Sequence, residues 1–205
     1  MTDALLESPL IVIGVSPRRE LSVDGRGCVL AEVQFMDIVN VRGDASDARF
    51  AQAVQEATGL ALPVQANTAT VQGARQLIWL GPDEWVLKDA GATADASVGT
   101  AIDSPLAAAL RSALAQHPAL HHSVVETGSA HTTFTLQGPA SADLLARGCP
   151  LDLHPRAFAS GALAQSHIAR APTLIRCVQA GQSYEITVRR SFAPYLFEWL
   201  CAAGD

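Results

Sequence analysis

Charge is scarce in this sequence, and lysine is almost absent. Charged residues make up 17% of the 205 positions, the formal net charge is −6, and Lys88 is the single lysine. The basic residues form no run longer than the pairs Arg18-Arg19 and Arg189-Arg190. Binding to nucleic acid needs clustered positive charge that neutralises phosphates, so this class of function is disfavoured. A surface with so few charges instead hints that a partner covers part of it.

Long apolar runs and paired cysteine motifs are also missing. No stretch approaches the roughly 20 apolar residues of a membrane span. The N-terminus lacks the charged segment and long apolar run of a signal peptide. The cysteines match neither a zinc pattern nor a CxxC redox pair; they are Cys28, Cys149, Cys177 and Cys201. We therefore expect buried, reduced thiols and a cytoplasmic protein.

The short motifs of phosphate-binding loops and nucleophile elbows are absent as well. Ser129 and His131 could suggest a hydrolase pair, but no acid is fixed to orient the histidine. Gly128-Ser129 is typical of a turn. Cys149 follows a predicted helix end, whereas a thiolate is favoured at a helix start, so we interpret it as an apolar contact.

Two further groups of polar residues invite a chemical interpretation. His121 and His122 could bind a metal with Glu126, but neighbouring residues on a strand point to opposite faces and cannot reach one ion. Asp83 and Glu84 could be paired carboxylates, but a tight turn makes solvated residues the better interpretation. We therefore predict no catalytic, cofactor-binding or metal-binding residue in this chain.

The residues that are present follow one pattern twice. Residues 38–46 and 134–141 both read as a strand, a glycine and a helix start. In the first, Arg42-Gly43-Asp44 is interpreted as a strand end, a turn glycine and a helix cap. Gly59 supplies a stop for the first helix, and Gly148 for the second. Pro139 fits the first position of that second helix.

A hairpin and another helix are predicted after each of these units. The hairpins span residues 76–87 and 173–188, with turns at 81–83 and 180–182. Ser104 caps one helix and Pro105 opens it. Ser191 caps the last helix, and Gly204 ends it. Its apolar stripe has helical spacing and comprises Phe192, Tyr195, Leu196, Trp199 and Leu200.

These elements predict an α+β fold of two pseudo-repeated strand–helix–hairpin–helix halves, with antiparallel-rich sheets covered by helices. We expect residues 1–30 to form an N-terminal arm with a short apolar stretch from Leu10 to Val15. Residues 31–205 are predicted to form a single domain whose halves span about 31–118 and 119–205. The polar stretch 89–100 is interpreted as a surface loop.

The run from Gly148 to Phe158 is the most distinctive in the chain, and it resembles the gamma subunit of heterotetrameric sarcosine oxidase. The resemblance extends over residues 75–203 and includes the segments 80–85, 137–140, 169–171, 184–185 and 190–193. One departure is His131, which stands where the family pattern would place an arginine. Within the run, prolines restrict the backbone and Asp152 can accept hydrogen bonds from nearby N–H groups.

The resemblance implies a fold similar to the folate-binding domain of aminomethyltransferases. It also implies a complex that oxidises sarcosine to glycine, hydrogen peroxide and a one-carbon unit on tetrahydrofolate. The resemblance further implies that FAD, FMN, NAD, zinc and tetrahydrofolate belong to other subunits, and that the partners are the alpha, beta and delta subunits. The chain itself would be a non-catalytic structural subunit. Its candidate interface with a partner comprises Pro150, Asp152, Arg156 and Phe158, and an equally weighted alternative is that this segment only bridges a helix and a strand.

Two other classes of function stay open. One is a free-standing folate-dependent protein of the same fold, such as an aminomethyltransferase or an iron–sulfur assembly protein. The assembly family carries a Lys-Gly-Cys motif of which only Gly148-Cys149 is present here, which argues against that choice. The other is a binding module unrelated to amine oxidation.

Overall fold

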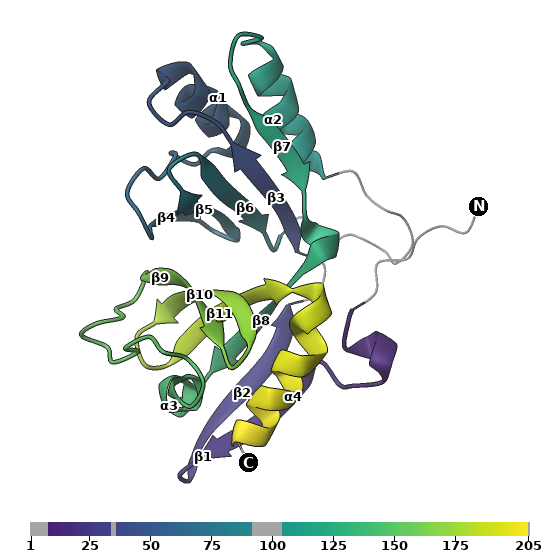
Figure 1. Ribbon diagram of the computed structural model, residues 1–205, viewed down its shortest axis with the longest axis vertical. Helices are drawn as coiled ribbons and strands as arrows, with labels where there is room; N and C mark the ends of the chain where they lie inside the picture. The colour runs from purple at the N-terminus through teal and green to yellow at the C-terminus, as the bar shows by residue number, and fades with distance from the viewer. Residues whose placement is uncertain (1–7, 34–35, 92–103, 205) are drawn as a thin grey trace. The chain divides into compact units, whose positions relative to one another are not determined.

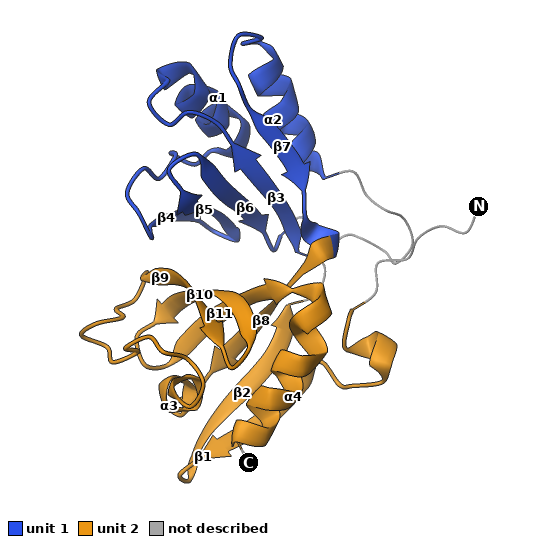
Figure 2. Cartoon of the chain, viewed as in Figure 1, with its two compact units in different colours: residues 1–6, 35–129 blue, residues 7–34, 130–205 orange. Residues whose placement is uncertain are grey.

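The computed structural model describes residues 8–33, 36–91 and 104–204. The chain divides into two compact units, shown in different colours in Figure 2. Unit 1 comprises residues 1–6 and 35–129, and unit 2 comprises residues 7–34 and 130–205. Each unit contains one antiparallel sheet with helices packed on it (Figure 1). The predicted mixture of helices with antiparallel sheets is therefore confirmed.

Unit 1 contains a five-stranded sheet in the order β4-β5-β6-β3-β7. Its elements are β3 (Asp37–Arg42), α1 (Ala48–Thr58), β4 (Ala69–Gln72), β5 (Arg75–Gly81), β6 (Glu84–Asp89), α2 (Pro105–Ala115) and β7 (Ser123–Glu126). Both helices bury aliphatic side chains against one face of the sheet. Trp85 lies at the centre of this core, 5.7 Å from the Phe50 ring, and its indole N–H donates to the Pro63 carbonyl at 2.7 Å.

Unit 2 contains a six-stranded sheet in the order β1-β2-β8-β11-β10-β9. Its elements are η1 (Ile11–Ile13), β1 (Arg18–Val23), β2 (Arg26–Val33), β8 (His131–Gln137), α3 (Ser141–Ala146), β9 (Leu163–Ile168), β10 (Ala171–Gln179), β11 (Ser183–Arg189), η3 (Arg190–Phe192) and α4 (Ala193–Gly204). A further short helical turn, η2 (Gly128–Ala130), precedes β8. The core joins the sheet to α3 and α4, and the Phe134 and Phe197 rings meet there at 5.8 Å.

The predicted hairpins and the start of one helix are confirmed. β5 and β6 pair across the turn after Gly81, and β10 pairs with β11. Tyr184, Ile186 and Val188 are buried, as their alternation along a strand predicts. Pro105 opens α2, and the Ser104 hydroxyl accepts a hydrogen bond from the Ala107 N–H at 2.9 Å. Local sequence therefore decides these turns and this cap.

Three helix starts differ from the predictions. The side chain that caps α1 belongs to Asp47 and not to Asp44. Pro139 lies two residues before the first residue of α3, outside the helix. Ser191 lies inside the η3 turn that leads into α4, where it makes no cap. In each case the polar or proline signal is real, but a turn is inserted between it and the helix.

The buried face of α4 also differs from the predicted stripe. Leu196 and Leu200 are buried as expected, but Phe197 is buried too, while Tyr195 is 38% exposed. The helix is apolar nearly all round, so spacing alone does not select the face that packs on the sheet.

The N-terminal segment differs most from its predicted form. Residues 18–33 form the hairpin of β1 and β2, which is part of the sheet of unit 2, where an arm of residues 1–30 was predicted. Leu21, Val23 and Leu30 are buried in the core of that unit. The division between the units also falls at 129/130 and not near 118. The predicted loop at 89–100 lies mostly outside the described residues.

The helices of the described residues include none that is long and apolar enough to cross a membrane.

Gly138 allows a test of how tightly the β1–β2 hairpin packs against the residue that follows β8. Its φ is 134°, and a Cβ there would lie 2.6 Å from the Gly27 carbonyl oxygen and 2.7 Å from the Cys28 Cα. We expect Gly138→Ala to lower the free energy of unfolding by about 2–4 kcal/mol, because strain and overpacking add. Urea denaturation followed by circular dichroism measures this loss.

Gly161→Ala is the matched control for strain without a clash. Gly161 has a φ of 89° and no atom within 4 Å of its added Cβ. We expect a loss of roughly 1 kcal/mol there. Equal losses for the two variants would contradict tight packing of the hairpin on Gly138.

Candidate functional site

Residues 148–158 form a connector between α3 and β9. It begins at Gly148, where the close approach of α4 leaves no room for a side chain. A Cβ on Gly148 would lie 2.3 Å from the Trp199 ring of α4. The Gly148 and Cys149 N–H groups both donate to the Leu145 carbonyl, which closes the end of α3. A glycine here lets α3 end against α4, and this packing sets the direction in which the connector leaves.

A chain of short hydrogen bonds then shapes the exposed part of the connector. The Asp152 carboxylate accepts from the His154 N–H at 3.0 Å, and the His154 ring nitrogen accepts from the Arg156 N–H at 3.2 Å. The predicted bonding of Asp152 to a nearby N–H is therefore observed. The Ala157 and Phe158 N–H groups both donate to the His154 carbonyl. The connector is thus an ordered turn.

The candidate interface residues divide into two kinds. Pro150, Asp152 and Arg156 are exposed, and Arg156 takes part in no ion pair with another described residue. Phe158 is only 7% exposed and stacks on Tyr184 with ring centroids 6.5 Å apart and an interplanar angle of 15°. Its assignment to a partner interface therefore needs correction, because the side chain holds the connector onto its own core.

The polar side chains considered for metal binding and acid–base chemistry bond to nearby groups of the fold. His122 lies 2.9 Å from the Leu120 carbonyl, and Glu126 forms an ion pair with Arg111 at 2.8 Å. Asp83 pairs with Arg42 at 2.8 Å. The residues that the structure describes contain no group of three or more His, Cys, Asp or Glu side chains that could hold a metal ion.

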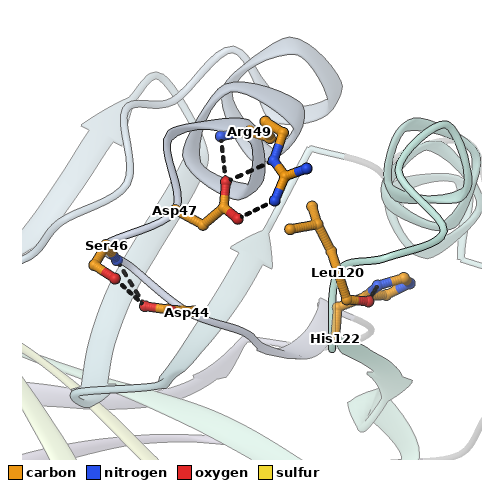
Figure 3. A network of polar contacts seen from close by, with 6 residues as sticks. All are labelled: Asp44, Ser46, Asp47, Arg49, Leu120 and His122. Atoms are coloured by element: carbon orange, nitrogen blue, oxygen red, sulfur yellow. Dashed lines mark hydrogen bonds and ion pairs between the residues drawn. The ribbon is translucent and has the colours of Figure 1, made fainter.

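The start of α1 explains the Arg42-Gly43-Asp44 tripeptide (Figure 3). Asp44 accepts from the Ser46 N–H and hydroxyl, and these bonds lower the pKa of its carboxyl. Asp47 accepts from the Arg49 guanidinium and N–H, which lowers its pKa to about 2. A Cβ on Gly43 would overlap the Phe50 ring. The tripeptide therefore forms the corner between β3 and α1.

The prediction of buried thiols holds for three of the four cysteines. All four are free thiols; Cys28, Cys149 and Cys177 are buried, and Cys201 is partly exposed. Burial raises the pKa of the Cys28 and Cys177 thiols. The Cys149 sulfur lies 4.0 Å from the Ser166 hydroxyl.

An acidic cluster that no sequence motif predicts lies at one end of the unit 1 sheet. Asp37 on β3 lies opposite Asp89 on β6. Glu126 on β7 lies opposite Val39 on β3. Asp89 forms an ion pair with Arg75, whereas Asp37 accepts a hydrogen bond from the Ser104 hydroxyl at 2.7 Å. No local motif predicts this cluster, because only the pairing of strands brings its members together.

The pKa of Asp37 responds to this environment. Burial raises it, the Ser104 hydrogen bond lowers it in part, and the charges of Glu126 and Asp89 raise it further. The ionised form of Asp37 is therefore less favourable in the folded state than in the unfolded chain.

Comparison with known proteins gives a consistent result. A family model described as the sarcosine oxidase, gamma subunit family matches residues 42–205. The sarcosine oxidase gamma subunit of Corynebacterium sp. strain P-1 is 34% identical over 85% of this chain and 78% of its own length. That of strain U-96 is 32% identical over 87% of this chain and 80% of its own length.

Solved structures show the same relationship. A chain of the heterotetrameric sarcosine oxidase from Corynebacterium sp. U-96 matches with a TM-score of 0.75 and 28% identity, over 89% of this chain and 86% of that chain. Aminomethyltransferase T of the glycine cleavage system from Bartonella henselae matches with a TM-score of 0.54 and 16% identity. That match covers 83% of this chain and 44% of the other, and it shows a shared fold alone.

The raised pKa of Asp37 predicts the effect of Asp37→Asn. Asparagine can still accept the Ser104 hydrogen bond but carries no buried charge, so we expect the variant to be more stable than the wild type at pH 7. The gain should shrink as the pH falls through the raised pKa, because the wild-type carboxyl then also becomes neutral. Urea denaturation from pH 3 to pH 7 measures it.

Asp83→Asn removes an exposed carboxylate that pairs with Arg42 and serves as the control. We expect no gain in stability from it at pH 7. A loss of stability in Asp37→Asn at pH 7 would show that the charge of Asp37 is favourable in the fold.

Proposed function

The chain belongs to the sarcosine oxidase gamma subunit family, and we propose that it is a non-catalytic subunit that supports assembly of a heterotetrameric sarcosine oxidase. The observation that carries this proposal is the match to a chain of such a heterotetramer over 89% of this chain and 86% of that one. Nearly the whole fold therefore corresponds to one subunit, and the partners proposed for it are the alpha, beta and delta subunits.

A structural role is also consistent with how the chain uses its polar residues. The carboxylates of Asp47, Asp83 and Asp152 each bind groups that shape a turn or a helix start. In this proposal the oxidation of sarcosine to glycine and hydrogen peroxide, with transfer of a one-carbon unit to tetrahydrofolate, belongs to the other subunits. FAD, FMN, NAD and zinc are assigned to those subunits as well. Free thiols that are mostly buried support a location in the reducing cytoplasm.

We propose that the exposed side of the 148–158 connector contacts a partner subunit. Pro150, Asp152 and Arg156 lie on an ordered turn, so little conformational entropy is lost when they bind. Arginine is among the residues enriched at the centres of interfaces. Phe158 contributes indirectly, because its stacking on Tyr184 anchors the turn.

We also propose that the two units descend from one repeated strand–helix–hairpin–helix element. The order β4-β5-β6-β3 in the first sheet corresponds to β9-β10-β11-β8 in the second. α1 and α3 follow the corresponding strands β3 and β8, and α2 and α4 follow the hairpins. This correspondence supports the pseudo-repeat.

Arg156→Ala tests the proposed contact. We expect partner recovery from co-expressed subunits to fall by on the order of tenfold, because a central arginine contact is lost. The free energy of unfolding of the isolated chain should change by less than about 0.5 kcal/mol, since the side chain is exposed. Affinity pull-down and urea denaturation measure the two effects.

Phe158→Ala is the contrasting variant and should destabilise the isolated chain by about 3–5 kcal/mol, since it empties part of the core. If Arg156→Ala lowered stability as much as it lowered recovery, Arg156 would be a structural residue of the connector.

Folate binding separates the proposed role from that of a free-standing folate-dependent protein. We expect titration calorimetry of the isolated chain with tetrahydrofolate to show weak binding or none. A dissociation constant in the micromolar range would favour the alternative.

A further inference from the structure

A fixed turn presents apolar side chains at the start of unit 2. The Ser8 hydroxyl accepts hydrogen bonds from the Leu10 N–H at 3.1 Å and the Ile11 N–H at 3.3 Å, and Leu10 is fully buried. The same hydroxyl donates to Glu32, which also accepts from Thr132 at 2.8 Å. The turn of η1 is therefore anchored at its base, and its outer side chains are held in place.

Those outer side chains are large, apolar and adjacent. Ile11, Val12 and Ile13 are 53%, 58% and 48% exposed. The other large apolar residues that the structure describes as exposed stand singly along the chain. Scattered apolar residues are ordinary on a protein surface, but three neighbours held together mark a surface that something covers.

A pocket of about 540 Å³ adjoins this turn within unit 2, lined by Pro9, Val12, Ala130, Arg189, Arg190 and Ser191. Its lining thus combines the apolar residues Pro9, Val12 and Ala130 with two arginines. Val12 belongs to both the pocket and the exposed turn, so the two features form one surface.

Arg189 and Arg190 pair with no described carboxylate. By contrast, the arginines of unit 1 all form ion pairs, namely Arg42, Arg49, Arg75 and Arg111. His131 lies opposite Arg189 in the pairing of β11 with β8, so no acid neutralises it from that position. In a chain of net charge −6, the pocket is a local site of positive charge.

We propose that this surface, formed by η1 and the Arg189–Arg190 pocket, receives a segment of a partner subunit in which a carboxylate stands beside apolar side chains. The inference rests on the proposed function and assigns it a second contact, apart from the 148–158 connector. The carboxylate pairs with the arginines, and the apolar side chains cover Ile11, Val12 and Ile13.

The same features argue against other occupants. A small anion would satisfy the arginines but leave the aliphatic side chains in water. A second copy of this chain, related by two-fold symmetry, would set the same arginines against one another and so repel. A partner segment of mixed acidic and apolar character satisfies both halves of the surface.

The test uses the assembled complex from co-expressed subunits, with the Arg189→Glu/Arg190→Glu double variant and the Val12→Asp variant of this chain. We expect each to weaken binding of this chain to the other subunits, the double variant by roughly 30-fold or more. Arg19→Glu is the control, because Arg19 is exposed on β1 and pairs with no described carboxylate. The melting temperatures of the isolated variants should stay close to that of the wild type.

A photo-crosslinking residue at position 12 gives a readout that does not depend on affinity. We expect it to label a partner-subunit peptide that contains Asp or Glu next to apolar residues, as read by mass spectrometry. Labelling of a second copy of this chain, or of no partner peptide in an intact complex, would overturn the inference.

The outcomes also separate this inference from the proposed function. If the wild type assembles and the pocket variants bind as tightly as Arg19→Glu, the pocket contact is wrong while the subunit role stands. If the wild-type chain does not bind the other subunits at all, both fail.

Discussion

The pairing of β2 with β8, and of β7 with β3, is the constraint on which the rest of this fold depends. β2 directly precedes β3 in the chain but belongs to the sheet of unit 2, and β7 directly precedes β8 but belongs to the sheet of unit 1. Each sheet is therefore completed by the strand that leads into the other. A fragment cut near residue 118 would lack β7, and the remaining C-terminal half would expose the edge of β8. Neither sheet can therefore be completed by one contiguous half of the sequence.

This arrangement also determines where surfaces for partners can form. Because β1 and β2 join the sheet of unit 2, the η1 turn before them lies next to the end of β11 and the η3 turn. The connector is positioned differently, by the contact of Gly148 with Trp199 and by the stacking of Phe158 on Tyr184. Both proposed contact surfaces are thus rigid because the core beneath them is well packed. A subunit that works by assembly needs such surfaces more than it needs a pocket with converging reactive groups.

The scarcity of charge acquires a structural meaning in this context. Several of the arginines fix corners and strand ends through carboxylates, as Arg42 does with Asp83 and Arg75 with Asp89. Exposed ion pairs of this kind contribute little to stability, so their value lies in fixing local geometry. Arg156, Arg189 and Arg190 are used in no such way among the described residues. They are three of the arginines without a described carboxylate partner, and they lie on the two proposed contact surfaces.

Elements that depend on neighbours along the chain could be predicted before the structure was known. The hairpins at 75–89 and 171–189 follow from turn residues and alternation, and the start of α2 follows from Ser104 and Pro105. The Gly148–Phe158 run sufficed to identify the family, because a long specific motif carries that information. The tertiary structure alone decided the strand status of residues 18–33, the burial of Phe158 and Phe197, and the gathering of Asp37, Asp89 and Ser104. Each of these depends on contacts between residues far apart in the chain, and no local pattern of side chains encodes which distant strand or ring will be the partner.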